Sequence, residues 1–163
     1  MSDPQRIAER VRDHMWATDR ASQGMGMHVA AIGPGACTMT MTVREGMLNG
    51  FGTCQGGLMT TLADSCFAFA CNAYNEITVA AGFDVQIVAP ARLGDVLTAT
   101  AVELSKTSRL GVYDVDVRNQ RDERIAVFRG RSYTIKGKPV LPAPAARMLR
   151  AITEAHISMS SAV

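Results

Sequence analysis

The sequence predicts an α+β fold, in which an antiparallel β-sheet is wrapped around one long, buried helix. Two observations predict it. The segment from Gly56 to about Tyr74 is apolar on almost every side, and four strand-like segments follow it with no helix between them. A helix without a polar face lies in a core. Strands that do not alternate with helices form antiparallel sheets rather than doubly wound parallel ones.

The composition of the 163-residue chain is that of an ordinary globular protein, with 47% hydrophobic and 20% charged residues. The length fits a single domain over residues 1–163. A net charge of +2 and the absence of a basic run with interleaved aromatic residues argue against nucleic-acid binding. No apolar run reaches the roughly 18 residues of a membrane span, and the charged first twelve residues do not resemble a signal peptide. We therefore expect a cytoplasmic protein without a membrane segment.

The first part of the chain is predicted to form one helix and one or two strands. Residues 4–21 have apolar side chains such as Val11 and Met15 at near-helical spacing, which predicts an amphipathic helix. Glycines and a proline mark turns within residues 24–35. Residues 37–43 alternate between apolar side chains and threonine, which predicts a strand with one buried face.

A glycine-rich connection over residues 46–52 leads to the buried helix. The polar residues of this helix are spaced three or four apart, so they form one narrow stripe. The four strands that follow are expected at residues 77–90, 95–106, 110–120 and 123–136. The tail over residues 138–163 begins with three prolines and is expected to end in a short helix. The polar stripe of the buried helix consists of Thr60, Thr61, Asp64 and Ser65.

The start of the buried helix is the candidate functional site. Gly56 and Gly57 have no Cβ, so a ligand can approach the backbone closely there. The N–H groups of a first helical turn have no intrahelical partner and lie at the positive end of the helix dipole. They can hold a phosphate or the oxyanion that forms when a carbonyl is attacked. Because no phosphate-loop or dinucleotide motif is present, the oxyanion interpretation fits better.

Asp64 is a carboxylate in an otherwise apolar helix. It is either a structural acid held by Thr60, Thr61 or a neighbouring helix terminus, or a functional group. No lysine or arginine occurs between Arg44 and Arg92 to pair with it. An unpaired acid is costly to bury, and its position near an oxyanion-type helix start favours the functional interpretation.

Three stretches resemble the hotdog-fold acyl-CoA thioesterases of the phenylacetic acid degradation type. They are "LNGFGTCQGGLMTTLAD", "GVYDVDVRNQ" and "AVFRGRSYTI", and the resemblance covers about residues 25–137. That family has Asn-Gly, then His-Gly-Gly, then an Asp nine residues after the His. The matching positions here are Asn49-Gly50, Gln55-Gly56-Gly57 and Asp64, with the spacing intact and Gln in place of His.

The resemblance implies a hotdog fold, a curved antiparallel sheet wrapped around a long central helix, and hydrolysis of a small or aromatic, phenylacetyl-type acyl-CoA. It implies that the amides of Gly56 and Gly57 polarise the thioester carbonyl and that Asp64 attacks it or activates water. Asn49 would orient the substrate or that water. Gln55 can donate and accept hydrogen bonds but does not titrate. CoA is part of the substrate, and no cofactor or metal is expected.

The distance between the two halves of this site predicts an oligomer. Asp64 lies eight residues beyond Gly56, about 12 Å along a helix at ~1.5 Å per residue. A base or nucleophile must come within roughly 3 Å of its target. Asp64 therefore cannot act on a carbonyl held by its own chain's Gly56. The resemblance implies that a second subunit supplies the acid, in a homodimer or a dimer of dimers (a homotetramer).

Two other functions remain open on the sequence. Gln55 in place of His leaves a non-catalytic acyl-CoA sensor as an alternative. A hotdog dehydratase is a further alternative, although its chemistry needs a His–acid pair and this stretch contains no histidine.

Cysteine and basic residues supply further candidates. Cys54 could be a nucleophile with a lowered pKa at a helix start, but a small residue packed under the loop is the simpler interpretation. Basic side chains would be needed to bind the CoA phosphates. The candidates are Arg92, Lys106, Arg109, Arg129, Arg131, Lys136 and Lys138.

Overall fold

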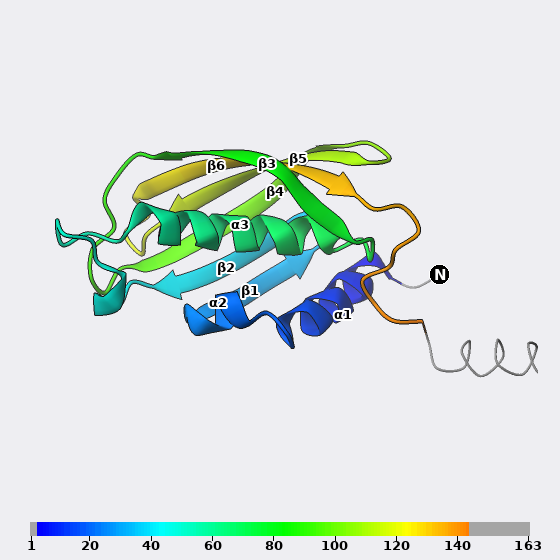
Figure 1. The fold of residues 1–163 in the computed structure, drawn as a ribbon, viewed down its shortest axis with the longest axis horizontal. Helices are drawn as coiled ribbons and strands as arrows, with labels where there is room; N and C mark the ends of the chain where they lie inside the picture. Colours follow the sequence, from blue (N-terminus) through cyan, green and yellow to red (C-terminus); the bar gives the residue numbers. More distant parts are fainter. Residues whose placement is uncertain (1–2, 144–163) are drawn as a thin grey trace, which may run out of the picture.

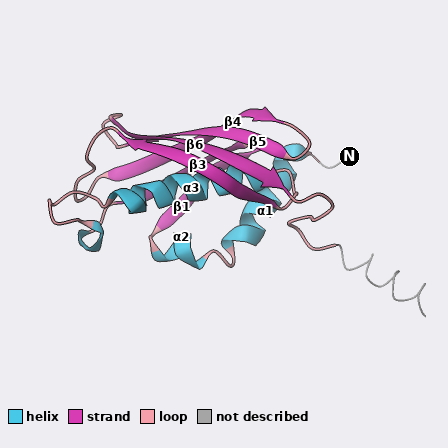
Figure 2. Ribbon diagram, turned by 45° about the horizontal axis from the view of Figure 1, so that its top comes forward, coloured by secondary structure: helices cyan, strands magenta, loops and turns pink. Residues whose placement is uncertain are grey.

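A computed structural model describes residues 3–143 of the chain, which form a six-stranded antiparallel sheet curved around one long helix (Figure 1). The long helix and the two N-terminal helices lie on the same side of the sheet (Figure 2). This arrangement confirms the predicted α+β class with a central buried helix. The helices are α1 Pro4–Trp16, α2 Arg20–Gly24 and α3 Gly56–Asn72, with a short 3-10 helix η1 at Glu45–Met47. The strands are β1 Met27–Gly33, β2 Ala36–Thr42, β3 Thr78–Ile87, β4 Val96–Lys106, β5 Leu110–Arg118 and β6 Arg124–Thr134.

The order of the strands across the sheet is β1-β2-β4-β5-β6-β3, and every neighbouring pair is antiparallel. The chain therefore leaves β2, passes through α3, and places β3 at the far edge before it returns to β4 beside β2. As a result β3 is paired only with β6, and its other edge has no strand partner within residues 3–143.

Helix α3 forms the centre of the core, as its composition predicted. Nine of its residues are buried, among them Leu62, Cys66 and Phe67. The sheet supplies apolar side chains from alternate positions, such as Met39 of β2, which is fully buried. In β5 the predicted alternation is confirmed, because every second residue from Gly111 to Val117 is buried.

The single N-terminal helix predicted over residues 4–21 is wrong. The structure divides it into α1 and α2, separated by residues 17–19. Asp19 is the N-cap of α2, and its carboxylate accepts the N–H of Ser22 at 3.0 Å. Such a local cap competes with continuation of a helix. The break turns α2 towards α3, where the Ser22 and Ser65 hydroxyls lie 3.0 Å apart.

The predicted strands and the buried helix match those observed to within a few residues at each end. Of the one or two strands expected before α3, the structure contains two, because residues 27–33 form β1 within the segment assigned to turns. The short helix expected at the end of the tail lies outside the described residues.

Candidate active site

The loop between η1 and α3 is organised by the side chain of Asn49. Its Oδ1 accepts the backbone N–H of Phe51 at 2.9 Å and that of Thr53 at 3.3 Å. Its Nδ2 donates to Thr53 Oγ1 at 3.1 Å. This pattern is an Asx turn, in which the side chain replaces a backbone partner. Asn49 thus shapes the loop beside the helix start, and its predicted contact with substrate or water stays a prediction.

The first turn of α3 leaves two backbone N–H groups without a partner in the described part of the chain. Leu58 donates its N–H to Gln55 O at 3.0 Å, and Gln55 donates its own to Met47 O at 2.8 Å. Gly56 and Gly57, between them, make no such bond. Gln55 is the N-cap residue, but its exposed side chain makes no capping hydrogen bond. The free donors are therefore those that the sequence predicted.

The two glycines differ in what surrounds them. A Cβ on Gly56 would lie 2.7 Å from Ile87 Cδ1, so close packing with β3 accounts for glycine there. A Cβ on Gly57 would meet no atom within 4 Å. Glycine is unfavourable in a helix by ~1 kcal/mol relative to alanine, and no atom of residues 3–143 requires it at Gly57. The open space above Gly57 is where a ligand or a second chain could approach the backbone.

A groove of about 350 Å³ opens beside this helix start. Its volume is within the range of small-ligand sites, roughly 300–1,000 Å³. Asn49 and Gly56 form part of its wall, whereas Gln55, Gly57 and Asp64 are not among its lining residues. The complete lining is Asn49, Thr53, Cys54, Gly56, Met59, Ile87, Val88, Ala89 and Pro90.

Asp64 lies two turns further along α3 and is half-buried. Removal of its carboxyl group from water raises its pKa above the ordinary value of 3.8, and no neighbouring charge or hydrogen bond opposes this shift. The hydroxyls of Thr60 and Thr61 donate to Gly56 O at 3.0 Å and Gly57 O at 2.8 Å, not to the acid. Neither threonine therefore holds Asp64 by a hydrogen bond, which argues against a structural role for this acid.

Cys54 is buried beneath the loop, and burial raises the pKa of its thiol. A nucleophilic cysteine at a helix start would have a lowered pKa. The simpler interpretation, a small residue packed in the core, therefore fits the structure.

The structure divides the candidate basic residues into two groups. Arg129 and Arg131 pair with Asp114 and Asp84, each at 2.7 Å. Lys106 pairs with Glu76 at 3.6 Å, and Arg109 donates to the Tyr133 hydroxyl. Within residues 3–143 no ion pair involves Arg92, Lys136 or Lys138, which leaves these three as the less committed cations.

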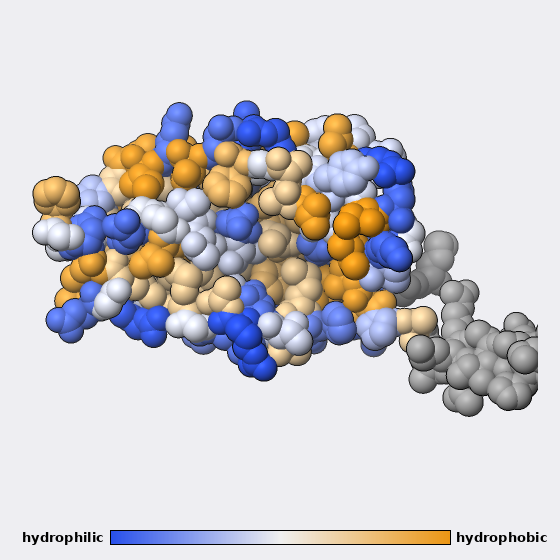
Figure 3. Space-filling model, in the orientation of Figure 1, coloured by the Kyte–Doolittle hydropathy of each residue, from blue (hydrophilic) through white to orange (hydrophobic). Residues whose placement is uncertain are grey.

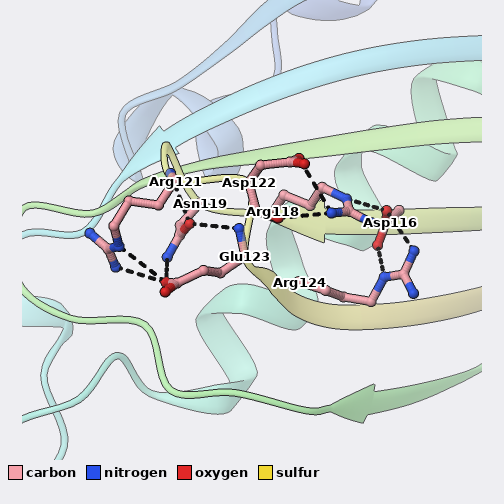
Figure 4. A network of polar contacts seen from close by, with 7 residues as sticks. All are labelled: Asp116, Arg118, Asn119, Arg121, Asp122, Glu123 and Arg124. Carbon is pink, nitrogen blue, oxygen red and sulfur yellow. Dashed lines mark hydrogen bonds and ion pairs between the residues drawn. The ribbon is translucent and has the colours of Figure 1, made fainter.

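Two larger hollows, of about 450 and 600 Å³, lie on the sheet face away from α3. Their charged side chains satisfy one another. Asp116 pairs with Arg118 and Arg124, each at 2.7 Å. Figure 4 shows that Arg118 also bonds to Asp122 in the β5–β6 turn, where Glu123 bonds separately to Asn119 and Arg121. Groups that are already paired make a solvated surface rather than a reactive one, so we place the candidate site at the smaller groove.

Other classes of site find no support in the described residues. Residues 3–143 contain no cluster of His, Cys, Asp or Glu arranged to hold a metal ion. None of the helices described is long and apolar enough to cross a bilayer.

The curved sheet wrapped around a central helix defines a hotdog protein, and among the described residues two N–H groups at the start of that helix have no partner. The model of the thioesterase superfamily matches residues 51–126. The chain is 37% identical to the acyl-coenzyme A thioesterase PaaI of Escherichia coli, over 76% of this chain and 88% of that protein. The chain therefore belongs to the thioesterase superfamily.

Solved structures agree with this assignment. The PaaI protein from the phenylacetic acid degradation operon of E. coli superposes with a TM-score of 0.82 and 34% identity, over 83% of this chain and 99% of that one. A mutant of the phenylacetic acid degradation protein PaaI of Thermus thermophilus has a TM-score of 0.69 and 30% identity, over 72% of this chain and all of that one. These matches confirm the hotdog fold.

Proposed function

We propose that the protein hydrolyses an acyl-CoA thioester to a free acid and CoA. The observation that carries this proposal is the unpartnered N–H of Gly57, with open space above it, in a chain similar to the acyl-coenzyme A thioesterase PaaI. An oxyanion forms when a thioester carbonyl is attacked, and preorganised backbone donors stabilise such a charge.

The chemistry divides between the first turn of α3 and Asp64, two turns further along the helix. The Gly56 and Gly57 N–H groups donate to the carbonyl oxygen, and Asp64 either removes a proton from water or attacks the carbonyl carbon itself. In the first case the water oxygen forms a bond to carbon, the carbon–sulfur bond breaks, and CoA leaves as the thiol after protonation. In the second case the Asp64 carboxylate bonds to the acyl carbon, the carbon–sulfur bond breaks, and CoA leaves as the thiol after protonation. Water then hydrolyses the mixed anhydride to the free acid and restores the Asp64 carboxylate.

A second subunit supplies the missing half of each site. Gly57 and Asp64 lie about 10 Å apart along α3 at ~1.5 Å per residue, too far for one substrate carbonyl. A two-fold axis that crosses α3 midway between them, at Thr60 and Thr61, would bring each Asp64 beside the partner's Gly57. The exposed side of α3 carries small or polar residues at these positions, which supports a close approach of two helices.

The free edge of β3 supports the same pairing. An edge strand with exposed apolar side chains is a template for another chain. Val79, Phe83 and Ile87 of β3 are 46%, 42% and 46% exposed, although they are large and apolar. Figure 3 shows apolar surface along the path that β3 follows in Figure 1. Pairing of two β3 strands would continue the sheet across the dimer; a dimer of dimers remains compatible with it.

The acyl group is proposed from the relatives alone. The similarity to PaaI proteins, one of them from a phenylacetic acid degradation operon, favours a phenylacetyl-type group. Gln55 would orient the carbonyl by hydrogen bonding, without transferring a proton. The location in the cytoplasm and the absence of a cofactor remain predictions.

The test is thiol release from a panel of acyl-CoA substrates, followed with a thiol reagent. We expect turnover, with phenylacetyl-CoA and its ring-hydroxylated forms ahead of long-chain acyl-CoA. Binding of acyl-CoA without thiol release would replace the enzyme with the sensor. Release of water from a hydroxyacyl-CoA would favour the dehydratase. An active monomer at assay concentration, seen by analytical ultracentrifugation, would contradict the shared site.

A further inference from the structure

Two neighbouring threonines of α3 bond to the carbonyl groups of the two glycines. Thr60 Oγ1 donates to Gly56 O at 3.0 Å, and Thr61 Oγ1 donates to Gly57 O at 2.8 Å. A helix carbonyl ordinarily accepts only the N–H four residues later. The carbonyls of this first turn therefore receive a second donor, at the end of the helix where the proposed oxyanion would bind.

Each of these bonds acts on a different backbone N–H. The carbonyl of Gly56 and the N–H of Gly57 belong to one peptide unit. A hydrogen bond to the oxygen of a peptide polarises the unit and strengthens its N–H as a donor. The Thr60 hydroxyl thus acts on the Gly57 N–H, which has no partner in the described chain and opens to free space.

Thr61 provides the contrast within the same turn. The carbonyl of Gly57 shares its peptide unit with the N–H of Leu58, and that N–H is already donated to Gln55 O at 3.0 Å. Polarisation by Thr61 therefore strengthens the hydrogen bond between Leu58 N–H and Gln55 O, which lies within the helix start and does not face a ligand. Of the two threonines, Thr60 is the one bonded to a peptide whose N–H has no partner among the described residues.

We propose that Thr60 is a positioning residue that strengthens the Gly57 N–H as an oxyanion donor. The Thr60 hydroxyl is already donated to Gly56 O, so it acts through this peptide and not by donating to substrate. This inference rests on the proposed thioesterase function and on the geometry of the Thr60 bond.

The expected size of the effect follows from two general magnitudes. Loss of a whole oxyanion donor costs about 10²–10³ in kcat. Cooperative strengthening is about 10–30% per hydrogen bond. Applied to the logarithm of the rate, this fraction gives a loss of about two- to eightfold in kcat when the Thr60 hydroxyl is removed.

The experiment compares Thr60→Val with Thr61→Val, which removes the same group one residue later. We expect Thr60→Val to lower kcat about two- to eightfold with KM nearly constant. Thr61→Val should lower kcat less, and Thr60→Ser, which keeps the hydroxyl, should restore it. Melting temperatures of all three variants report on folding. In 1H–15N spectra, the Gly57 amide proton should move upfield in Thr60→Val and stay in place in Thr61→Val.

The outcomes separate this inference from the proposed function. A wild type that releases no thiol from any acyl-CoA overturns both. An active wild type with equal kcat losses in the two valine variants, or with no recovery in Thr60→Ser, overturns the role of Thr60 alone. An unchanged Gly57 amide shift in Thr60→Val contradicts the polarisation itself, whatever the kinetics show.

Discussion

The two ends of α3 differ in how completely their polar groups are satisfied. At the C-terminal end, Asn72 Oδ1 accepts the N–H of Thr78 at 2.9 Å, and its Nδ2 donates to the carbonyls of Ala68 and Thr78 at 2.9 and 2.8 Å. At the N-terminal end, the N–H groups of Gly56 and Gly57 have no partner in the described part of the chain, and the Gln55 side chain makes no cap. The polar groups at the C-terminal end of α3 are thus hydrogen-bonded, whereas those at its N-terminal end are available to a ligand.

This difference distinguishes structural from functional polar groups. Buried polar groups are almost always hydrogen-bonded in a folded chain, and an unsatisfied one needs an explanation. Asn72 is buried and fully used, so its role is to fix the start of β3 against α3. The N–H groups at Gly56 and Gly57, and the half-buried acid of Asp64, have no partner within residues 3–143. Gly57 is exposed and Gly56 and Asp64 are half-buried, so water can reach all three in the free chain and a ligand can take its place.

The largest expected effect concerns Asp64. Asp64→Asn keeps the size of the side chain but removes its charge, so kcat should fall ~10²–10⁴-fold, as for a positioned acid–base group. The variant should melt at or above the temperature of the wild type, because the charge that burial disfavours has gone. Steady-state kinetics and thermal unfolding on one preparation test both. Near-wild-type kcat together with a lower melting temperature would make Asp64 a structural acid.

Gly57→Ala tests whether the open space above the helix start is used. A Cβ there meets no atom of the described residues within 4 Å, so the isolated fold should gain about 0.4–1 kcal/mol. If substrate or the partner subunit approaches this backbone, the methyl group displaces it, and misplacement of about 1 Å can cost ~10²-fold in rate. The measurements are kcat/KM and the free energy of unfolding.

Gly56→Ala is the matched control for that experiment. Its Cβ would force Ile87 Cδ1 to move, so it should gain less stability than Gly57→Ala. A Gly57→Ala variant with full activity would show that nothing approaches Gly57 and would remove the main support for the oxyanion site.

Much of the fold was predictable, because the spacing of apolar residues along the sequence indicates which faces of a helix or strand are buried. The apolar composition of α3 and the alternation in β5 predicted both elements closely. The sequence did not predict the break between α1 and α2. The Asp19 cap depends on the backbone conformation of residues 17–19, which the spacing of apolar residues does not reveal. Likewise, the position of β3 at the sheet edge is a matter of tertiary order, which a strand pattern does not contain.

The candidate site was predicted only as a set of residues. The spacing of Gly56, Gly57 and Asp64 marked the segment at which the candidate site is placed. The length of a helix per residue was enough to show that the acid lies far from the glycines of its own chain. The sequence could not distinguish the two glycines, because the contact with Ile87 joins α3 to a strand thirty residues later. It also could not assign the Thr60 hydroxyl, which could have bonded to Asp64 instead of Gly56 O.

A substitution at the C-terminal end of α3 should lower stability and leave catalysis unchanged. Asn72→Ala would leave the buried N–H and carbonyl of Thr78 without their partner, at a cost of about 1–3 kcal/mol. We expect a lower melting temperature, with kcat/KM retained at temperatures where the variant is folded. Loss of kcat/KM in the folded variant would show that the two ends of α3 are coupled and not independent.

The smallest expected effect is the pH dependence that Asp64 brings to stability and rate. Burial raises the pKa of Asp64 above 3.8, so the folded chain binds more protons than the unfolded chain between that value and the raised pKa. Stability therefore decreases as pH rises through this window, and the loss is complete above the raised pKa. Asp64→Asn removes this dependence, so the difference in melting temperature between variant and wild type should grow with pH over the same window.

The pH dependence of the rate has the opposite sign, because catalysis needs the ionised acid. The value of kcat/KM should therefore rise with pH through the same pKa. Thermal unfolding of both proteins and a pH–rate profile of the wild type test this. A constant difference in melting temperature, or an acid limb at or below pH 3.8, would show that Asp64 is not the buried, ionising group of the site.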